Sequence, residues 1–118
     1  MGKISRHFTR KEVACKCGCG LDTIDAETMM LADQVRDLAG HPITPTSAAR
    51  CEWWNGKEGG SRGSQHPKCR AIDLPVKDVE RVYNELCKLH PGKYGFGKYV
   101  KKGFIHVDSR DTEARWEG

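Results

Sequence analysis

The sequence has little apolar material and no long hydrophobic run. Of its 118 residues, 37% are hydrophobic and 31% are charged, and no stretch approaches the ~20 apolar residues of a transmembrane helix. The first six residues lack the apolar region of a signal peptide, and Arg6 stands where a myristoylation signal needs Ser or Thr. We therefore expect no membrane insertion and a chain that is made in the cytoplasm.

Internal repeats, low-complexity segments and linkers are also absent. A chain of this length is expected to form one domain, residues 1–118, with a modest core that a bound metal would help to stabilise. The net charge of +4 suits an anionic partner such as a cell-wall polymer or a nucleic acid. Lysines cluster only at Lys98, Lys101 and Lys102, and no nucleic-acid-binding motif accompanies them. We expect a solvated surface there, no nucleic-acid partner and a monomeric protein.

Cysteine, in contrast, is abundant, with six residues in this short chain. Three of them form the C-x-C-x-C run Cys15–Cys19, which lacks the paired C-x₂-C knuckles of structural zinc sites. Without a secretory signal, reduced thiols or metal ligands are the default. The run is compatible with packed thiols, with disulfides to Cys51 or Cys69, or with a second, structural metal site. Cys87 falls in a helical pattern, and we expect it in the core.

Helix and strand signals alternate along the chain. Capping residues predict three helical segments, and alternation of apolar residues predicts the strands. Gly, Ser, Asn and charged residues over 50–63 predict a long surface loop. Helices separated by strands, with a hairpin at the end, indicate an α+β domain in which a small antiparallel sheet packs with two main helices. The predicted elements are a short turn capped by Thr9, a helix over 26–39 capped by Asp25 and ended by Gly40, a strand over 43–48, a strand over 70–76, a helix capped by Asp78 with Val79, Val82, Tyr83, Leu86 and Leu89 on one face, and strands near 94–100 and 103–108.

Two segments carry the side chains that point most directly to a chemistry. The first runs from Ser64-Gln65-His66 to Ala71-Ile72-Asp73, and the second is Phe104-Ile105-His106-Val107-Asp108. Together they supply two imidazoles and a carboxylate, a mixed N/O ligand set well suited to zinc. Three protein ligands leave one tetrahedral position for water, and bound Zn²⁺ lowers the pKa of that water to roughly 7. The leading hypothesis is metal-assisted hydrolysis.

These segments, with Ser47-Ala48-Ala49-Arg50, the loop glycines Gly59-Gly60 and the opening His7–Glu12 and Cys15–Cys19, resemble the M15 family of zinc metallopeptidases. The resemblance is to its small D-alanyl-D-alanine carboxypeptidase-like branch, which is frequent in bacteriophages and prophages. It implies a fold like that of the hedgehog proteins and DD-peptidases. It also implies a Zn²⁺ cofactor and hydrolysis of amide bonds in peptidoglycan peptides, by a carboxypeptidase or by a murein endopeptidase (endolysin) that acts on the wall after release.

Carried over by position, the resemblance implies that His66, Asp73 and His106 ligate zinc. Many relatives place an acid three residues before the last zinc histidine, where this chain has Gly103. The nearest acid is Asp108, on the same strand face as His106 and about 6–7 Å from it along the backbone. Asp108 is therefore predicted as the base, or as a partner that orients His106. The alternative is an ion pair with Arg110 or Arg50.

The predicted substrate contacts lie before the first histidine. Arg50 matches an arginine that, in the resembled family, faces substrate and stabilises the oxyanion or a peptide carboxylate, so it is predicted as both catalytic and substrate-binding. Ser64 either hydrogen-bonds near the metal or caps its loop. Trp54 is predicted to line the cleft, whereas Trp116 is expected to be simple packing.

Two other hypotheses remain open from the sequence. The site could hold zinc and a wall peptide without cleaving it, as a non-catalytic binding module, and Gly103 in the place of an acid is the best support for this. Alternatively, Cys69 or Cys51 could act as a nucleophile with His66, which requires a thiolate of lowered pKa. Cys69 stands where relatives usually have Gly, which makes the local redox state a real question.

Overall fold

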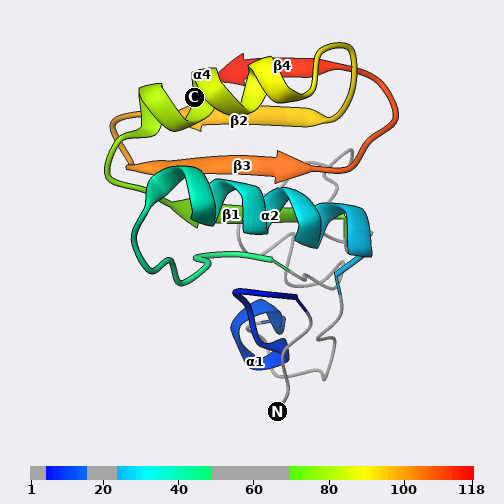
Figure 1. The fold of residues 1–118 in the computed structure, drawn as a ribbon, viewed down its shortest axis with the longest axis vertical. Coiled ribbons are helices and arrows are strands. Elements are labelled where there is room, and N and C mark those ends of the chain that lie inside the picture. The colour runs from blue at the N-terminus through cyan, green and yellow to red at the C-terminus, as the bar shows by residue number, and fades with distance from the viewer. Residues whose placement is uncertain (1–4, 16–23, 49–69) are drawn as a thin grey trace.

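The computed structural model describes residues 5–15, 24–48 and 70–118. Two main helices and a four-stranded sheet make up most of this part of the chain, with a short helix ahead of them (Figure 1). The α+β class expected from the sequence is confirmed. The elements are α1 (Arg10–Val13), α2 (Ala26–Ala39), β1 (Ala71–Pro75), α4 (Val79–Leu89), β2 (Gly95–Tyr99), β3 (Phe104–Asp108) and β4 (Ala114–Glu117).

The sheet is mixed, with the strand order β1-β3-β2-β4. β3 pairs antiparallel with both β1 and β2, and β4 pairs parallel with β2 at the edge. The expectation of a wholly antiparallel sheet is wrong for β4. The chain reverses direction after β3 and passes beyond β2 before it pairs, and a strand antiparallel to β3 on the far side of β2 must run parallel to β2. No sequence signal predicted β4, which has only four residues.

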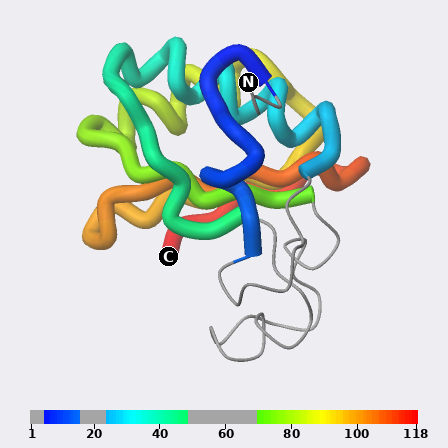
Figure 2. Tube along the Cα trace, turned by 90° about the horizontal axis from the view of Figure 1, so that it is seen from below, coloured from blue at the N-terminus to red at the C-terminus, as the bar shows by residue number. Residues whose placement is uncertain are grey.

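Helices α2 and α4 both pack on one face of the sheet, and the other face points away from them (Figures 1 and 2). Strand alternation explains this layering, because successive side chains of a strand point to opposite faces. Apolar residues at every second position form the core beneath the helices, and the polar residues between them point away. The fully buried core side chains of the strands are Ile72, Leu74, Phe96, Ile105 and Val107.

The helix boundaries follow the predicted caps. The Thr9 hydroxyl accepts a hydrogen bond from the Glu12 N–H, and the Glu12 carboxylate accepts one from the Thr9 N–H, so α1 begins with a complete capping box. Asp25 caps α2, and Gly40 ends it at φ +73°, a conformation that glycine adopts without strain. Leu89, predicted on the apolar face of its helix, lies at the end of α4 and is 54% exposed, unlike the buried residues of that face.

The predicted strand over 43–48 is also wrong. This segment forms an isolated bridge in which the N–H of Asp73 donates to the carbonyl of Ser47 at 2.7 Å. Pro42 and Pro45 explain the difference, because proline has no N–H to donate to a ladder. The bridge nevertheless holds the backbone of Asp73 on the edge of β1 that does not pair with β3.

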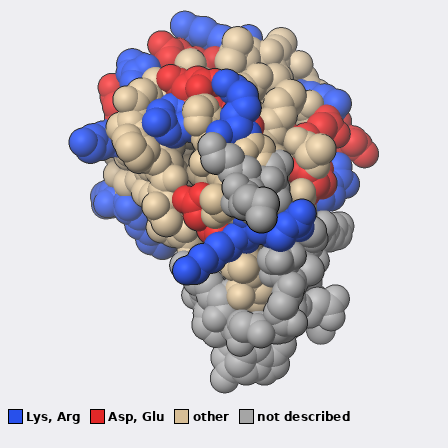
Figure 3. All heavy atoms as spheres, turned by 60° about the horizontal axis from the view of Figure 1, so that its bottom comes forward, with Lys and Arg blue, Asp and Glu red and all other residues tan. Residues whose placement is uncertain are grey.

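The described surface is mixed in charge, and basic and acidic side chains lie side by side on the face seen in Figure 3. Lys98, predicted in a solvated lysine cluster, lies 3.0 Å from the carboxylate of Glu80. Within the described ranges, no helix combines the length and the apolarity that crossing a membrane requires. Cys87 packs partly buried against the core, as expected. Cys15 is buried, and the other cysteines of the C-x-C-x-C run lie outside the described residues.

Candidate functional site

Two of the three predicted zinc ligands lie side by side on the sheet face that the helices leave uncovered. Asp73 of β1 and His106 of β3 are direct partners in the antiparallel register. The Nδ1 atom of His106 lies 2.9 Å from Oδ1 of Asp73. Both side chains are mostly buried. The strands that carry them pair with each other along their whole length, so a carboxylate oxygen and an imidazole nitrogen are presented together from one ladder.

The other ring nitrogen of His106 contacts Asp108, two residues further along β3. The distance from Nε2 to Oδ2 of Asp108 is 2.7 Å. Arg110 binds the same carboxylate in a bidentate manner, with Nε and Nη2 each 2.7 Å from one of its oxygens. The Asp108 side chain has an exposed fraction of 0%. Asp108 therefore forms the ion pair with Arg110 that the sequence left open as the alternative to a catalytic role, and it also contacts His106.

The pKa shifts of Asp108 and His106 follow from their hydrogen bonds to each other, to Asp73 and to Arg110. Burial alone would raise the pKa of Asp108, but hydrogen bonds from His106 and Arg110 outweigh it and hold the pKa well below its usual range. Burial alone would lower the pKa of His106, but hydrogen bonds to Asp108 and Asp73 raise it instead. The group is thus built to keep Asp108 ionised and to favour positive charge at His106.

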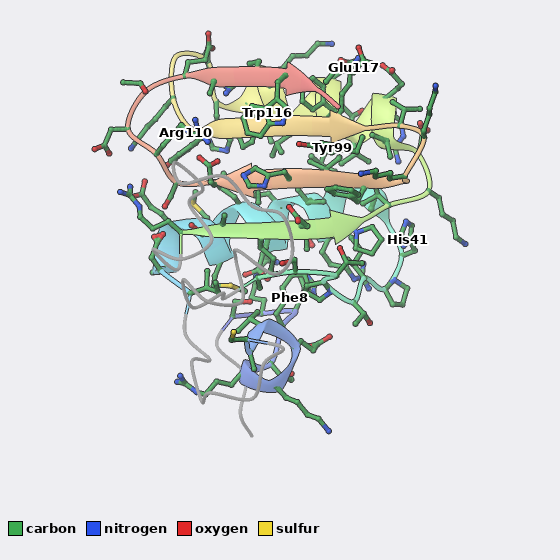
Figure 4. All side chains as sticks on the ribbon, turned by 180° about the vertical axis from the view of Figure 1, so that it is seen from behind. Phe8, His41, Tyr99, Arg110, Trp116 and Glu117 are labelled. Atoms are coloured by element: carbon green, nitrogen blue, oxygen red, sulfur yellow. The ribbon has the colours of Figure 1, made fainter. Side chains whose placement is uncertain are left out.

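Two glycines of β2 make room for the group. Gly95 pairs with Asp108 and Gly97 with His106 across the sheet. A Cβ at Gly95 would lie 2.4 Å from the Asp108 carboxylate, and a Cβ at Gly97 would lie 2.3 Å from Nε1 of Trp116. Only glycine at both positions lets side chains from outside β2 lie flat over it. Figure 4 shows Trp116 on this face, between Arg110 and Tyr99.

The arrangement fits a zinc ion in its donor chemistry. In the neutral tautomer that donates Nε2–H to Asp108, the Nδ1 atom of His106 would carry the lone pair that a metal requires, and this atom lies 2.9 Å from Oδ1 of Asp73. A carboxylate behind a ligating histidine is the usual outer partner of a zinc site. Within residues 5–15, 24–48 and 70–118, no group of three or more His, Cys, Asp or Glu side chains is placed to hold a metal. The third predicted ligand, His66, lies outside those ranges.

Several other predicted site residues fall outside the described part of the chain, namely Arg50, Trp54 and Ser64, together with the alternative nucleophiles Cys51 and Cys69. Gly103, at the position where relatives have an acid, lies in the turn before β3 at φ +78° and donates its N–H to the carbonyl of Tyr99.

A buried polar cluster next to the site was not predicted. Ser109 follows Asp108 directly, and its hydroxyl lies 2.6 Å from Oδ2 of Asp25 and 2.9 Å from the hydroxyl of Thr28. The Arg70 guanidinium donates to the Ser109 carbonyl. The cap of α2 is thereby tied to the end of β3. The sequence gives no signal for this cluster, because Asp25 and Ser109 are far apart along the chain.

Comparison with known protein families shows which family the chain belongs to. The model of the family described as Peptidase M15 matches residues 6–108. The chain belongs to this family. Membership of the M15 family implies a peptidase, and the match covers Asp73, His106 and Asp108. Arg110 and Trp116 lie beyond its end. A comparison with curated proteins finds no match.

Proposed function

We propose that this M15 peptidase is zinc-dependent and hydrolyses amide bonds in the peptides of bacterial peptidoglycan. His66, Asp73 and His106 would hold the ion. The observation that carries the proposal is the pair of donor atoms on β1 and β3, where Nδ1 of His106 lies 2.9 Å from Oδ1 of Asp73. Zinc dependence is general in the M15 family, and the donor set here is of the kind that catalytic zinc sites use.

When bound, zinc would lower the pKa of a water molecule and polarise the carbonyl of the scissile amide. The residues of this chain would prepare the site for that chemistry. Asp73 supplies negative charge at the ligand position, and Asp108 holds the imidazole of His106 in one tautomer and one orientation. Arg50, carried over from the family resemblance, would stabilise the oxyanion or a carboxylate of the substrate.

For Asp108, the contacts support the orienting role over the role of base. Both of its oxygens are engaged by Arg110, and one of them is also engaged by His106. A carboxylate whose pKa is held this low is a weak proton acceptor. We therefore assign Asp108 as a positioning residue, and we look for the proton acceptor elsewhere in the site.

The wall substrate is proposed from the family resemblance and from charge. A net charge of +4 favours association with an anionic wall polymer. Ser64 and Trp54 would contact the peptide, and cleavage at the end of a stem peptide or at a cross-link are both compatible with the proposal. The peptidase would act on the wall after release from the cell, in the manner of a bacteriophage lysis enzyme.

The test is hydrolysis of purified peptidoglycan by the zinc-loaded protein, with released peptides and amino acids measured by mass spectrometry. We expect products from the wild type, their loss on addition of a chelator, and their return when zinc is restored. Leu89→Ala, at an exposed position on α4, serves as a control that should keep full activity. Product formation that continues unchanged in the chelator would contradict the zinc dependence.

One observation favours a second candidate, a non-catalytic module that binds wall peptides. The acid expected three residues before His106 is replaced by Gly103, and the nearest acid, Asp108, is engaged in its ion pair. A module of this kind would retain zinc and sediment with peptidoglycan but release no products from any wall type. The same experiment therefore separates the two functions.

A further inference from the structure

The residue directly after Asp108 is held by side chains from two distant parts of the chain. Ser109 is fully buried. Its hydroxyl lies 2.6 Å from Oδ2 of Asp25, the cap of α2, and 2.9 Å from the hydroxyl of Thr28 in the first turn of that helix. Nε of Arg70, the residue before β1, donates to the same hydroxyl at 3.1 Å. A hydroxyl has one proton and two lone pairs, so these three partners use all of its bonding capacity.

The backbone of Ser109 is fixed by the same arginine. The Ser109 N–H donates to the carbonyl of Arg70 at 3.1 Å, and Nη2 of Arg70 donates to the carbonyl of Ser109. These bonds begin where the β1–β3 ladder ends, because its last pair is Ala71 with Asp108. The ends of strands open more easily than their centres. The bonds between Arg70 and Ser109 therefore close the end of the ladder that carries Asp108.

This end of the ladder is next to the metal-ligand pair. The Asp108 side chain is fully buried, and its Oδ2 atom lies 2.7 Å from Nε2 of His106. Successive side chains of an extended chain point to opposite sides, so Asp108 and Ser109 diverge. Figure 1 shows the start of α2 beside the end of β3. The bonds to Ser109 thus hold the chain from the helix side, at the point where Asp108 contacts His106 on the other side.

We propose that Ser109 is a positioning residue of the zinc site, which acts through Asp108 to hold the imidazole of His106 in the orientation that binds the ion. This assignment rests on the proposed zinc-dependent function of the same site. The cap of α2 does not require Ser109, because the Asp25 carboxylate already accepts the N–H and the hydroxyl of Thr28. The additional bond from Ser109 therefore fixes the end of β3 rather than the start of the helix.

The test is the zinc affinity of the purified protein, measured by competition with a chelator of known affinity. Replacing a group that contacts a ligating histidine costs about 10–100-fold in metal affinity, and Ser109 lies one contact further away, so Ser109→Ala should weaken zinc binding by about 3–10-fold. Ser109→Thr keeps a hydroxyl and should restore most of the lost affinity. Val35→Ala, which truncates a fully buried side chain of α2, is the control for lost stability. It should lower the melting temperature and leave the zinc affinity of the folded protein unchanged.

A second route leaves the buried side chains unchanged. The Arg70 side chain is 34% exposed, and Arg70→Lys keeps the positive charge but loses the fork that reaches both the hydroxyl and the carbonyl of Ser109. This variant should also bind zinc about 3–10-fold more weakly, even if Ser109→Ala folds poorly. Its matched control is Arg81→Lys on α4, where the arginine pairs with Asp78 and Glu85. The control should bind zinc as the wild type does.

The outcomes separate this role of Ser109 from the proposed function. Weaker zinc binding that is confined to Ser109→Ala and Arg70→Lys supports the role. Wild-type affinity in Arg70→Lys and in folded Ser109→Ala would overturn it and leave the proposed function standing. A loss of the same size in Val35→Ala or Arg81→Lys would also overturn it, because the effect would then come from general destabilisation. A wild type that binds no zinc would overturn both the role and the zinc dependence of the function.

Discussion

The two faces of the sheet are built on different principles, although the same strands form both. On the helix side, Ile105 and Val107 of β3 are fully buried among apolar side chains from α2 and α4. On the other side, His106 and Asp108 of the same strand are held by hydrogen bonds and an ion pair. Neighbouring residues therefore serve stability and chemistry separately. Substitutions on one face should affect folding, and substitutions on the other should affect metal binding and activity.

The largest effect on stability is expected from Ile105→Ala. Removing a fully buried branched side chain from the core should lower the free energy of unfolding by about 2–5 kcal/mol. The zinc content of the folded protein should stay the same, because the neighbouring His106 points to the other face. Denaturant unfolding and metal analysis measure the two quantities. A variant that loses zinc while it remains folded would show that the two faces are not independent.

A smaller effect, confined to the other face, is expected from Asp108→Asn. The amide cannot take the place of the carboxylate that orients His106 and pairs with Arg110, so zinc affinity should fall by about 10–100-fold. Competition with a chelator of known affinity measures this change. The matched control is Asp37→Asn, whose carboxylate pairs with Arg6 on the surface at a side-chain exposure of 49%. Equal zinc affinity in Asp108→Asn and the wild type would contradict the positioning role.

The smallest effect is expected on the acid stability of the metal-free protein. The pKa of Asp108 is lower in the folded state than its ordinary value of 3.8, so the unfolded state binds more protons in that range. The stabilisation is present above pH 3.8 and is lost as the pH falls toward the lowered pKa. Each pKa unit of difference corresponds to about 1.4 kcal/mol. Urea unfolding between pH 5 and pH 2 should show a steeper loss for the wild type than for Asp108→Asn. Parallel curves for the two proteins would contradict the lowered pKa.

The side of the sheet that packs against the helices could be predicted from the sequence, because strand alternation and helix caps depend on residues that are close together along the chain. Alternation predicted the strand over 70–76, in which Ile72 and Leu74 are buried, and caps at Asp25 and Asp78 set the start of each main helix. The strand predicted over 43–48 was wrong, because its strand-like composition is outweighed by Pro45 within the segment and Pro42 just before it.

The site face could be predicted only in part. Asp73 and His106 were predicted as zinc ligands from the family resemblance, and the structure brings their side chains together. The position of Trp116 on this face could not be predicted, because it depends on a four-residue edge strand and on the missing side chain of Gly97 in a different strand. The Arg110 ion pair with Asp108 was one of several alternatives that local sequence could not separate. Contacts between elements that are far apart along the chain determine where the side chains of this face lie, and the periodicity of the sequence does not predict such contacts.

The most direct test of the central claim, a zinc ion held by residues of this sheet face, is the metal content of the purified wild type, Asp73→Ala and His106→Ala. Circular dichroism and melting temperature report whether each variant is folded. We predict about one zinc ion per chain in the wild type and a near-complete loss in both folded variants, since each removes one of the three ligands. A wild type without zinc, or folded variants that keep their full zinc content, would contradict the account.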